Sequence, residues 1–258
     1  MKVNVHGGHN RHVPGIISYL DEVTEDRKIS KEVQRLLKIN GSTVYDCTDD
    51  SARTQRGNLN NIVIKCNKHN VDLNMSIHFN GCKKVKKDGK TKGVEVWVQN
   101  MHSKAVPYAR RICSELERLG FTNRGVKGCK ENNHSLAVIR RTKAPALLIE
   151  VCFADDEDDI LLYKKLGYKS ISSAIVKAVL NKSSLKDDRK VDKSFKVKPK
   201  RKLVIWSRPT ASGKKVGKVE KGEVYSITKT AYKGKMPYGY LKSGAGWIKI
   251  HTKYVDRV

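Results

Sequence analysis

The chain has 258 residues, of which 38% are hydrophobic, and its formal net charge is +27. This content of hydrophobic residues supports packed cores and excludes a wholly disordered chain, and the length suits one α/β domain with a small second domain. So large a positive charge must be solvated or must meet an anion, such as nucleic acid, anionic lipid or an anionic cell-wall polymer. Charge alone does not choose among these partners.

The first half of the chain alternates between strand and helix signals. A short strand at 2–5 runs into a glycine turn, and apolar residues at helical spacing predict a helix over 22–39 that ends at Asn40-Gly41. The same patterns predict strands at 42–47 and 71–79, with the start of an amphipathic helix at 59–66 between them.

A lysine-rich loop, 83–92, follows, and its side chains are either solvated or hold an anionic wall polymer. Further predicted elements are a strand at 93–98, a helix at 103–119, a strand at 146–153, and helices at 156–165 and 169–181. The run ALLIEVCF at 146–153 is nearly continuously apolar, which is typical of a central strand buried on both faces. Together the elements predict an α/β fold with a twisted, mainly parallel sheet flanked by helices.

The composition changes after residue 181. Residues 182–199 are polar, charged and poor in large apolar side chains, so we expect a basic linker there. Short β runs separated by glycine and lysine then predict a small all-β barrel of about five strands over 200–258.

No stretch of 18 apolar residues occurs, so we expect no membrane span. The N-terminal sequence MKVNVHGGHN lacks the apolar region of a signal peptide, so we expect synthesis in a reducing cytosol and, for action outside, another exit route. The six cysteines form no C-x-x-C pair and are expected to be free thiols. We expect Cys152 to be a small buried apolar residue, since a nucleophilic cysteine needs a paired base.

Polar side chains stand where strands end or helices begin. His9 follows the first strand, Glu22 opens the first long helix, and His78 lies near the end of an apolar strand. Glu150 lies inside the most hydrophobic run, where an ionised carboxylate is costly unless a metal or partner stabilises it. Such groups meet at one edge of an α/β sheet and could hold a catalytic zinc.

Each residue also has a purely structural interpretation. His9 would suit a turn, Glu22 a helix N-terminus, His78 a core and Glu150 a buried salt bridge. The residues alone also leave neighbours open as ligands, because His6 and His12 flank His9 and Glu25 lies one helical turn from Glu22.

The segments GGHN, YLDEVTEDRKI, SIHFN, GVEVW, NRGVK and APALLIEVCF, in this order, resemble the zinc-dependent N-acetylmuramoyl-L-alanine amidases of the amidase-3 type. The resemblance covers residues 1–181 and is strongest to phage endolysins and Gram-positive cell-wall hydrolases. It implies that His9, Glu22 and His78 bind Zn²⁺ and that Glu150 is catalytic. It favours His9 because this histidine follows glycine, and it aligns Glu22 rather than Glu25 with the ligand.

The resemblance implies a peptidoglycan hydrolase that cuts the amide between the lactyl group of N-acetylmuramic acid and L-alanine of the stem peptide. Zinc-activated water would attack, with Glu150 as general base and then acid. The lack of a signal peptide favours a phage lysin, released from the bacterial host cytoplasm to the wall. A zinc peptidase cutting within the stem peptide, and a noncatalytic basic wall- or nucleic-acid-binding protein, are the alternatives.

Residues 200–258 resemble the bacterial SH3-like domains attached to wall hydrolases, which implies binding of peptidoglycan. The candidate groove aromatics are Trp206, Tyr225, Tyr232, Tyr238, Tyr240, Trp247 and Tyr254. From residue 184 onward 21 Lys and Arg stand against 6 Asp and Glu, a net +15, which suits teichoic acid or another anionic wall polymer. No motif for specific nucleic-acid binding is present. Glu95 in GVEVW alternates with valines and points away from them, so it either faces solvent, which we favour, or lies at the rim of the site.

Overall fold

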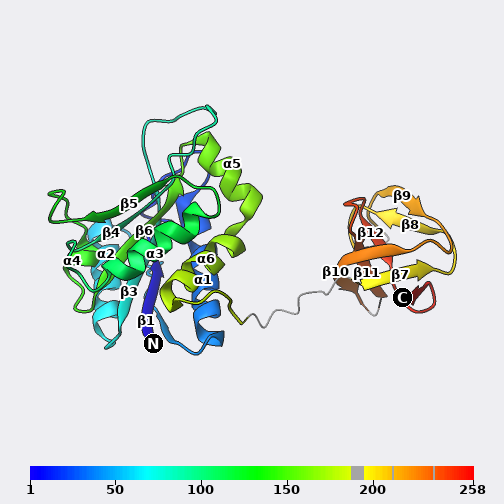
Figure 1. Cartoon of the computed structure of the whole chain (residues 1–258), viewed down its shortest axis with the longest axis horizontal. Helices are drawn as coiled ribbons and strands as arrows, with labels where there is room; N and C mark the ends of the chain where they lie inside the picture. Colours follow the sequence, from blue (N-terminus) through cyan, green and yellow to red (C-terminus); the bar gives the residue numbers. More distant parts are fainter. Residues whose placement is uncertain (187–194, 211, 235) are drawn as a thin grey trace. The chain divides into compact units, whose positions relative to one another are not determined.

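The computed structural model describes residues 1–186, 195–210, 212–234 and 236–258. The chain divides into two compact units, Met1–Asp187 and Asp188–Val258 (Figure 1). Within the described residues, no helix is both long and apolar enough to cross a membrane. All six cysteines are unpaired, and Cys152 is fully buried in the core, as expected of a small apolar residue.

The first unit is built on a six-stranded mixed sheet with the order β2-β1-β3-β6-β4-β5. Its strands are β1 (Lys2–Gly7), β2 (Thr43–Asp46), β3 (Leu73–Asn80), β4 (Val94–Val98), β5 (Asn123–Gly128) and β6 (Ala146–Phe153). All neighbouring pairs are parallel except β4 and β6, which are antiparallel. The strands β4 and β5 therefore run against the other four, in a sheet that is mainly parallel as predicted.

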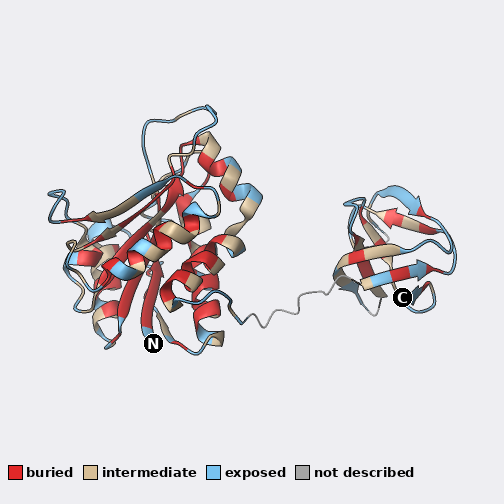
Figure 2. Ribbon diagram, in the orientation of Figure 1, coloured by how far each residue is buried: buried red, intermediate tan, exposed pale blue. Residues whose placement is uncertain are grey.

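Helices cover both faces of this sheet. One face packs against α1 (Glu22–Ile39), α3 (Val106–Glu117), α5 (Glu157–Leu166) and α6 (Tyr168–Leu180), whose apolar side chains form the larger core. The other face packs against α2 (Gln55–Asn67) and the one-turn α4 (Ala137–Arg140) in a smaller core. The strands between these layers are largely buried (Figure 2).

The strand β6 shows how a polar residue in this sheet comes to be largely enclosed. Leu147 and Ile149 point into the larger core, and Leu148 points into the smaller one. Since both faces are covered by helices, every residue of β6 except Glu150 is buried. Glu150, in the second half of the strand, is partly buried.

The start of α1 is fixed by a cap. The Asp21 side chain accepts a hydrogen bond from the Thr24 N–H, so the helix begins at Glu22, as the sequence predicts. Asn40 closes the helix through its N–H and its side-chain amide, both bonded to the Leu36 carbonyl. The Asp21 cap places Glu22 in the first turn of the helix, close to the loop that carries His9.

The second unit is an antiparallel sheet with the order β13-β7-β10-β11-β12-β8-β9. Its strands are β7 (Phe195–Pro199), β8 (Leu203–Trp206), β9 (Lys215–Val219), β10 (Tyr225–Lys233), β11 (Met236–Leu241), β12 (Trp247–Lys249) and β13 (Val255–Arg257). The all-β character was predicted. The predicted linker, 182–199, extends too far toward the C-terminus, because its last five residues belong to this unit. Strand β7 lies within it and pairs with β10 and β13, because Val197 is fully buried in the core of this unit. Residues 187–194 of that linker lie outside the described part of the chain.

Candidate metal centre

Three of the residues singled out in the sequence lie together at one edge of the sheet. One ligand atom from each of His9, Glu22 and His78 can be chosen so that all lie within 4.8 Å of one another. The Nδ1 atom of His78 is 3.1 Å from Oε1 of Glu22, and Nε2 of His9 is 3.8 Å from Oε2. Two imidazole nitrogens and one carboxylate are a donor set found in catalytic zinc sites that keep a position open for water.

Glu22 is held firmly although it is only 1% exposed. Its Oε2 accepts a hydrogen bond from the Ile16 N–H, and its Oε1 accepts one from the Phe79 N–H. Burial alone would raise the pKa of Glu22, but the hydrogen bond with His78 and the charges of both histidines lower it on balance. The carboxylate is therefore preformed in its ionised state, as a metal ligand must be.

The two histidines are positioned by different devices. His78 is fixed by its place in β3, whereas His9 lies in the loop after β1 with a positive φ of 49°. Burial lowers the pKa of His9, with His78 adding to the effect, and so favours its neutral ligand form. Burial would also lower the pKa of His78, but the hydrogen bond with Glu22 and the charge of Glu150 raise it.

The neighbouring candidates lie elsewhere. His6 is buried in β1, with its Nδ1 3.1 Å from the Gly7 carbonyl, and burial lowers its pKa to about 4. His12 is exposed and its Nε2 accepts from Arg11. Glu25 accepts a hydrogen bond from the Tyr163 hydroxyl and pairs with Lys28. The structure thus brings together His9, Glu22 and His78 and leaves out His6, His12 and Glu25.

Two glycines make room for this cluster. A Cβ atom on Gly8 would collide with the His78 ring, and one on Gly15 would collide with the Glu22 carboxylate and the His9 ring. Both positions therefore require glycine so that the backbone can approach the side chains closely. Together with the donor set, this close approach fits a compact metal centre.

Arg27 is a supporting residue that the sequence analysis did not single out. Its guanidinium donates to the carbonyls of Gly8 and His9 at 2.8 and 2.7 Å, and it pairs with Asp26 and Asp50. Arg27 therefore ties the His9 loop to helix α1, which carries Glu22. The sequence does not reveal this role of Arg27, because the carbonyl oxygens that accept its hydrogen bonds belong to the backbone and leave no residue pattern.

Glu150 lies next to the cluster on the neighbouring strand. In the pairing of β3 with β6, Glu150 is directly opposite His78. Its Oε2 atom is buried and has no hydrogen-bond partner among the described residues. Burial raises the pKa of Glu150 to about 7, His78 opposes this, and Glu22 and Glu95 add to it. A carboxyl group with such a pKa can take up and release a proton near neutral pH.

The favoured expectation for Glu95, that it faces solvent, was wrong. Glu95 is only 5% exposed and lies opposite Glu150 in the pairing of β4 with β6. It accepts hydrogen bonds from Asn80 at 2.9 Å, Trp97 at 3.1 Å and Arg124 at 2.7 Å. Alternation with valines placed it on the other face of the sheet, and that face is covered rather than solvated. Glu95 thus extends the polar row His78–Glu150 by one strand.

The basic loop is anchored through its backbone to the acidic start of α5. Asp158 accepts from the N–H groups of Asp88 and Gly89, and Glu157 accepts from that of Lys87. Asp159 accepts from the Gly93 N–H at the end of the loop. Within the described ranges the lysine side chains of this loop form no ion pair, so either role predicted for them stays a prediction.

A family model described as N-acetylmuramoyl-L-alanine amidase matches residues 3–181. An uncharacterized protein of Clostridium perfringens (strain 13 / Type A) is 32% identical over 234 residues, which are 86% of this chain and 67% of the relative. A second uncharacterized Clostridium perfringens protein is 36% identical over 180 residues, 69% of this chain and 51% of the relative. The chain therefore spans between half and two thirds of the length of these curated relatives.

Among solved structures, the catalytic domain of the CD27L endolysin targeting Clostridia difficile superposes on this chain with a TM-score of 0.61 and 27% identity. The superposition covers 71% of this chain and 99% of that domain. The likeness therefore spans the unit that contains the His9–Glu22–His78 cluster.

Proposed function

The chain belongs to the N-acetylmuramoyl-L-alanine amidase family, and on this premise we propose that it hydrolyses the amide between the lactyl group of N-acetylmuramic acid and L-alanine of the stem peptide in peptidoglycan. The observation that carries the proposal is the buried, unpartnered Oε2 of Glu150, which stands on the strand next to His78. A carboxyl oxygen left without a partner beside a metal-type cluster is available for a substrate or an attacking water.

We propose that His9, Glu22 and His78 hold Zn²⁺. When bound, the metal supplies a Lewis acid that polarises the scissile carbonyl and lowers the pKa of a coordinated water. The preformed carboxylate of Glu22 and the compact backbone at Gly8 and Gly15 support this assignment.

Glu150 performs the proton transfers in this proposal. Its Oε2 accepts the proton of the attacking water and then delivers that proton to the nitrogen of L-alanine as the amide breaks. The pKa of about 7 suits both steps, because the group is neither too acidic to accept nor too basic to donate. Glu95, held by Arg124, keeps negative charge behind Glu150 and supports its raised pKa.

The second unit is proposed to be an SH3-like module that holds the enzyme on the wall. Its support is the antiparallel sheet and the concentration of positive charge after residue 184. The setting we propose is that of an endolysin of a phage that infects Gram-positive bacteria, for which the likeness to the CD27L catalytic domain is the support.

Mass analysis of digested peptidoglycan tests the reaction. Cleavage at the proposed bond yields a free lactyl carboxyl on muramic acid and a stem peptide with an L-alanine N-terminus. The Glu150→Gln variant serves as the control and should yield neither. Products with a new N-terminus inside the stem peptide would contradict the proposal and indicate a zinc peptidase instead.

A further inference from the structure

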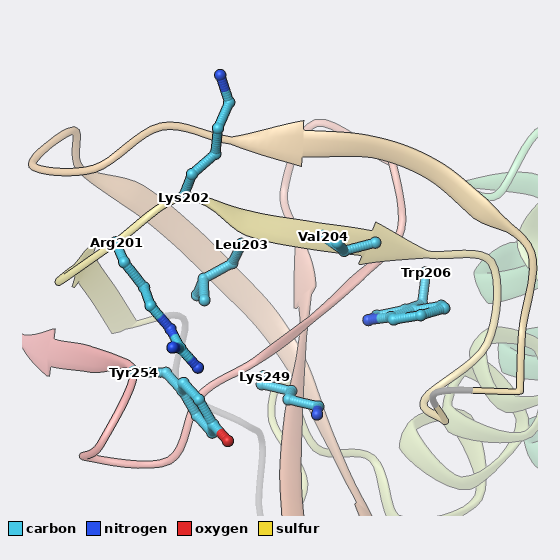
Figure 3. Close-up of a pocket in the computed structure, with 7 residues that line it drawn as sticks. All are labelled: Arg201, Lys202, Leu203, Val204, Trp206, Lys249 and Tyr254. Atoms are coloured by element: carbon cyan, nitrogen blue, oxygen red, sulfur yellow. The ribbon is translucent and has the colours of Figure 1, made fainter.

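A hollow of about 240 Å³ opens on the second unit, far in sequence from the metal centre (Figure 3). Three of the seven residues around it are basic and none is acidic; the lining consists of Arg201, Lys202, Leu203, Val204, Trp206, Lys249 and Tyr254. The hollow is thus both cationic and aromatic.

The strand pattern explains how these side chains reach one place. In β8, Leu203 and Ile205 are buried in the core, so Val204 and Trp206 lie on the opposite face. Trp206 is paired with Trp247 of β12, two residues before Lys249, so Lys249 shares that outer face. The sheet therefore presents Trp206 and Lys249 on the same face of adjacent strands, two residues apart in register.

Two cations converge on the ring of Tyr254. The guanidinium of Arg201 lies 4.7 Å from the ring centroid, and the Lys249 Nζ lies 5.6 Å from it. Neither cation has a carboxylate partner in the part of the chain that the structure describes. In Figure 3 the side chains of Arg201 and Lys249 both lie near the ring of Tyr254.

The basic residues on either side of Arg201 are neutralised. Lys200 pairs with Asp256 at 3.0 Å, and Lys202 pairs with Glu220 at 2.7 Å. The Lys202 side chain also points away from the hollow (Figure 3). Of the three basic residues that line the hollow, Arg201 and Lys249 are therefore the two without a carboxylate partner among the described residues, and both lie over the ring of Tyr254.

We propose that this hollow binds a phosphodiester group of an anionic wall polymer, with the phosphate between Arg201 and Lys249 and a sugar or polyol of the polymer against Trp206. The planar guanidinium and the ammonium group can both donate hydrogen bonds to the oxygens of a phosphate. The half-buried indole of Trp206 offers an apolar face to a carbohydrate or polyol. The inference rests on the proposed function only in placing the protein at a cell wall.

A repeating anion fits this unit better than a single carboxylate does. From residue 184 onward the chain carries a net charge of +15, far more than one carboxylate would balance. A polymer with a phosphate in each repeat can place one phosphate in the hollow while the phosphates of neighbouring repeats contact the surrounding lysines.

The test measures binding of the full chain carrying Glu150→Gln, which keeps the walls intact, to purified Clostridium perfringens walls. In that background Arg201→Gln with Lys249→Gln should weaken binding by about tenfold or more. The matched control, Lys233→Gln with Lys242→Gln, removes the same charge from two exposed lysines outside the hollow and should weaken binding far less. Arg201→Lys with Lys249→Arg keeps both charges and should retain most of the binding.

The second arm uses the same walls after hydrofluoric acid has removed their phosphodiester polymers. The parent should bind these walls more weakly, and the variant at Arg201 and Lys249 should bind them no more weakly than the parent does. An equal loss on treated and untreated walls would overturn the phosphate assignment, as would a variant that affects binding of a single-stranded oligonucleotide but not of walls. Failure of the amidase proposal would appear with the wild type, as walls left uncut or cut inside the stem peptide, an outcome separate from all of these.

Discussion

Arg27 is a residue that would act on the proposed metal centre without a direct role in the chemistry. Its guanidinium donates hydrogen bonds to the carbonyls of Gly8 and His9, so it fixes the loop that carries His9, one of the proposed ligands. We predict that Arg27→Ala lowers zinc affinity by about 10- to 100-fold, as losses of groups that orient metal ligands do. Zinc titration against a competing chelator measures this.

The matched control for Arg27 is Arg118→Ala. Arg118 is exposed, and among the described residues its ion pair is with Glu115, three residues earlier in the chain. Its replacement should leave zinc affinity unchanged. Equal zinc affinities for the Arg27 and Arg118 variants would refute the role assigned to Arg27.

At the scale of elements, Asp159 connects three of them. It is fully buried in the first turn of α5. Its carboxylate accepts hydrogen bonds from the N–H groups of Gly93, just before β4, and of Phe153, at the end of β6. Burial raises its pKa to about 6 despite these hydrogen bonds. The folded state thus holds the proton more tightly than the unfolded chain, so the stability that Asp159 contributes is present below its ordinary pKa of 3.8 and is lost as pH rises through about 6.

We therefore predict that the stability advantage of the wild type over Asp159→Asn shrinks by up to about 3 kcal/mol between pH 4 and 6.5. Urea unfolding followed by the helical circular dichroism signal reports on the first unit, which contains the described helices. Asp158→Asn is the control of opposite sign. Desolvation would raise the pKa of Asp158, but the N–H groups of Asp88 and Gly89 lower it, so its contribution is lost as pH falls. A pH-independent difference for Asp159→Asn would contradict the prediction.

Some elements were predictable because one physical signal dominated them. Helix α1 and strand β6 combine a long apolar pattern with clear ends, and both were found where predicted. Strand β5 reads NRGVKG and α4 is one turn of AVIR, so neither has enough periodicity to be recognised. The reversal of β4 was also invisible, because apolar alternation does not encode strand direction.

The candidate metal cluster could not be predicted from the spacing of residues alone. The positions of His9, Glu22, His78 and Glu150 at element ends suggested a site, but only the family resemblance separated them from His6, His12 and Glu25. Glu95 was missed because alternation tells which face a side chain takes, and not whether that face is covered. In β7, the alternation of Phe195 and Val197 with lysines was outweighed by the charged composition around it.

At the scale of the whole molecule, the charge of +27 should act on wall association rather than on the reaction itself. We predict that lysis of whole walls by the full chain slows markedly as salt rises from about 0.05 to 0.5 M, because screening shortens the reach of exposed charges. Hydrolysis of a small soluble muropeptide should change much less over the same range. Equal slowing of both reactions, or of neither, would show that the charge does not serve wall binding.

The most direct test of the central claim compares Glu150→Gln with the wild type in the same preparation, by zinc content and by release of L-alanine N-termini from peptidoglycan. The proposed roles predict that the variant binds as much zinc as the wild type while product release falls by about 100- to 10,000-fold, since the general acid and base is removed and the ligands are kept. Product release at the wild-type rate from the zinc-loaded variant would contradict the account.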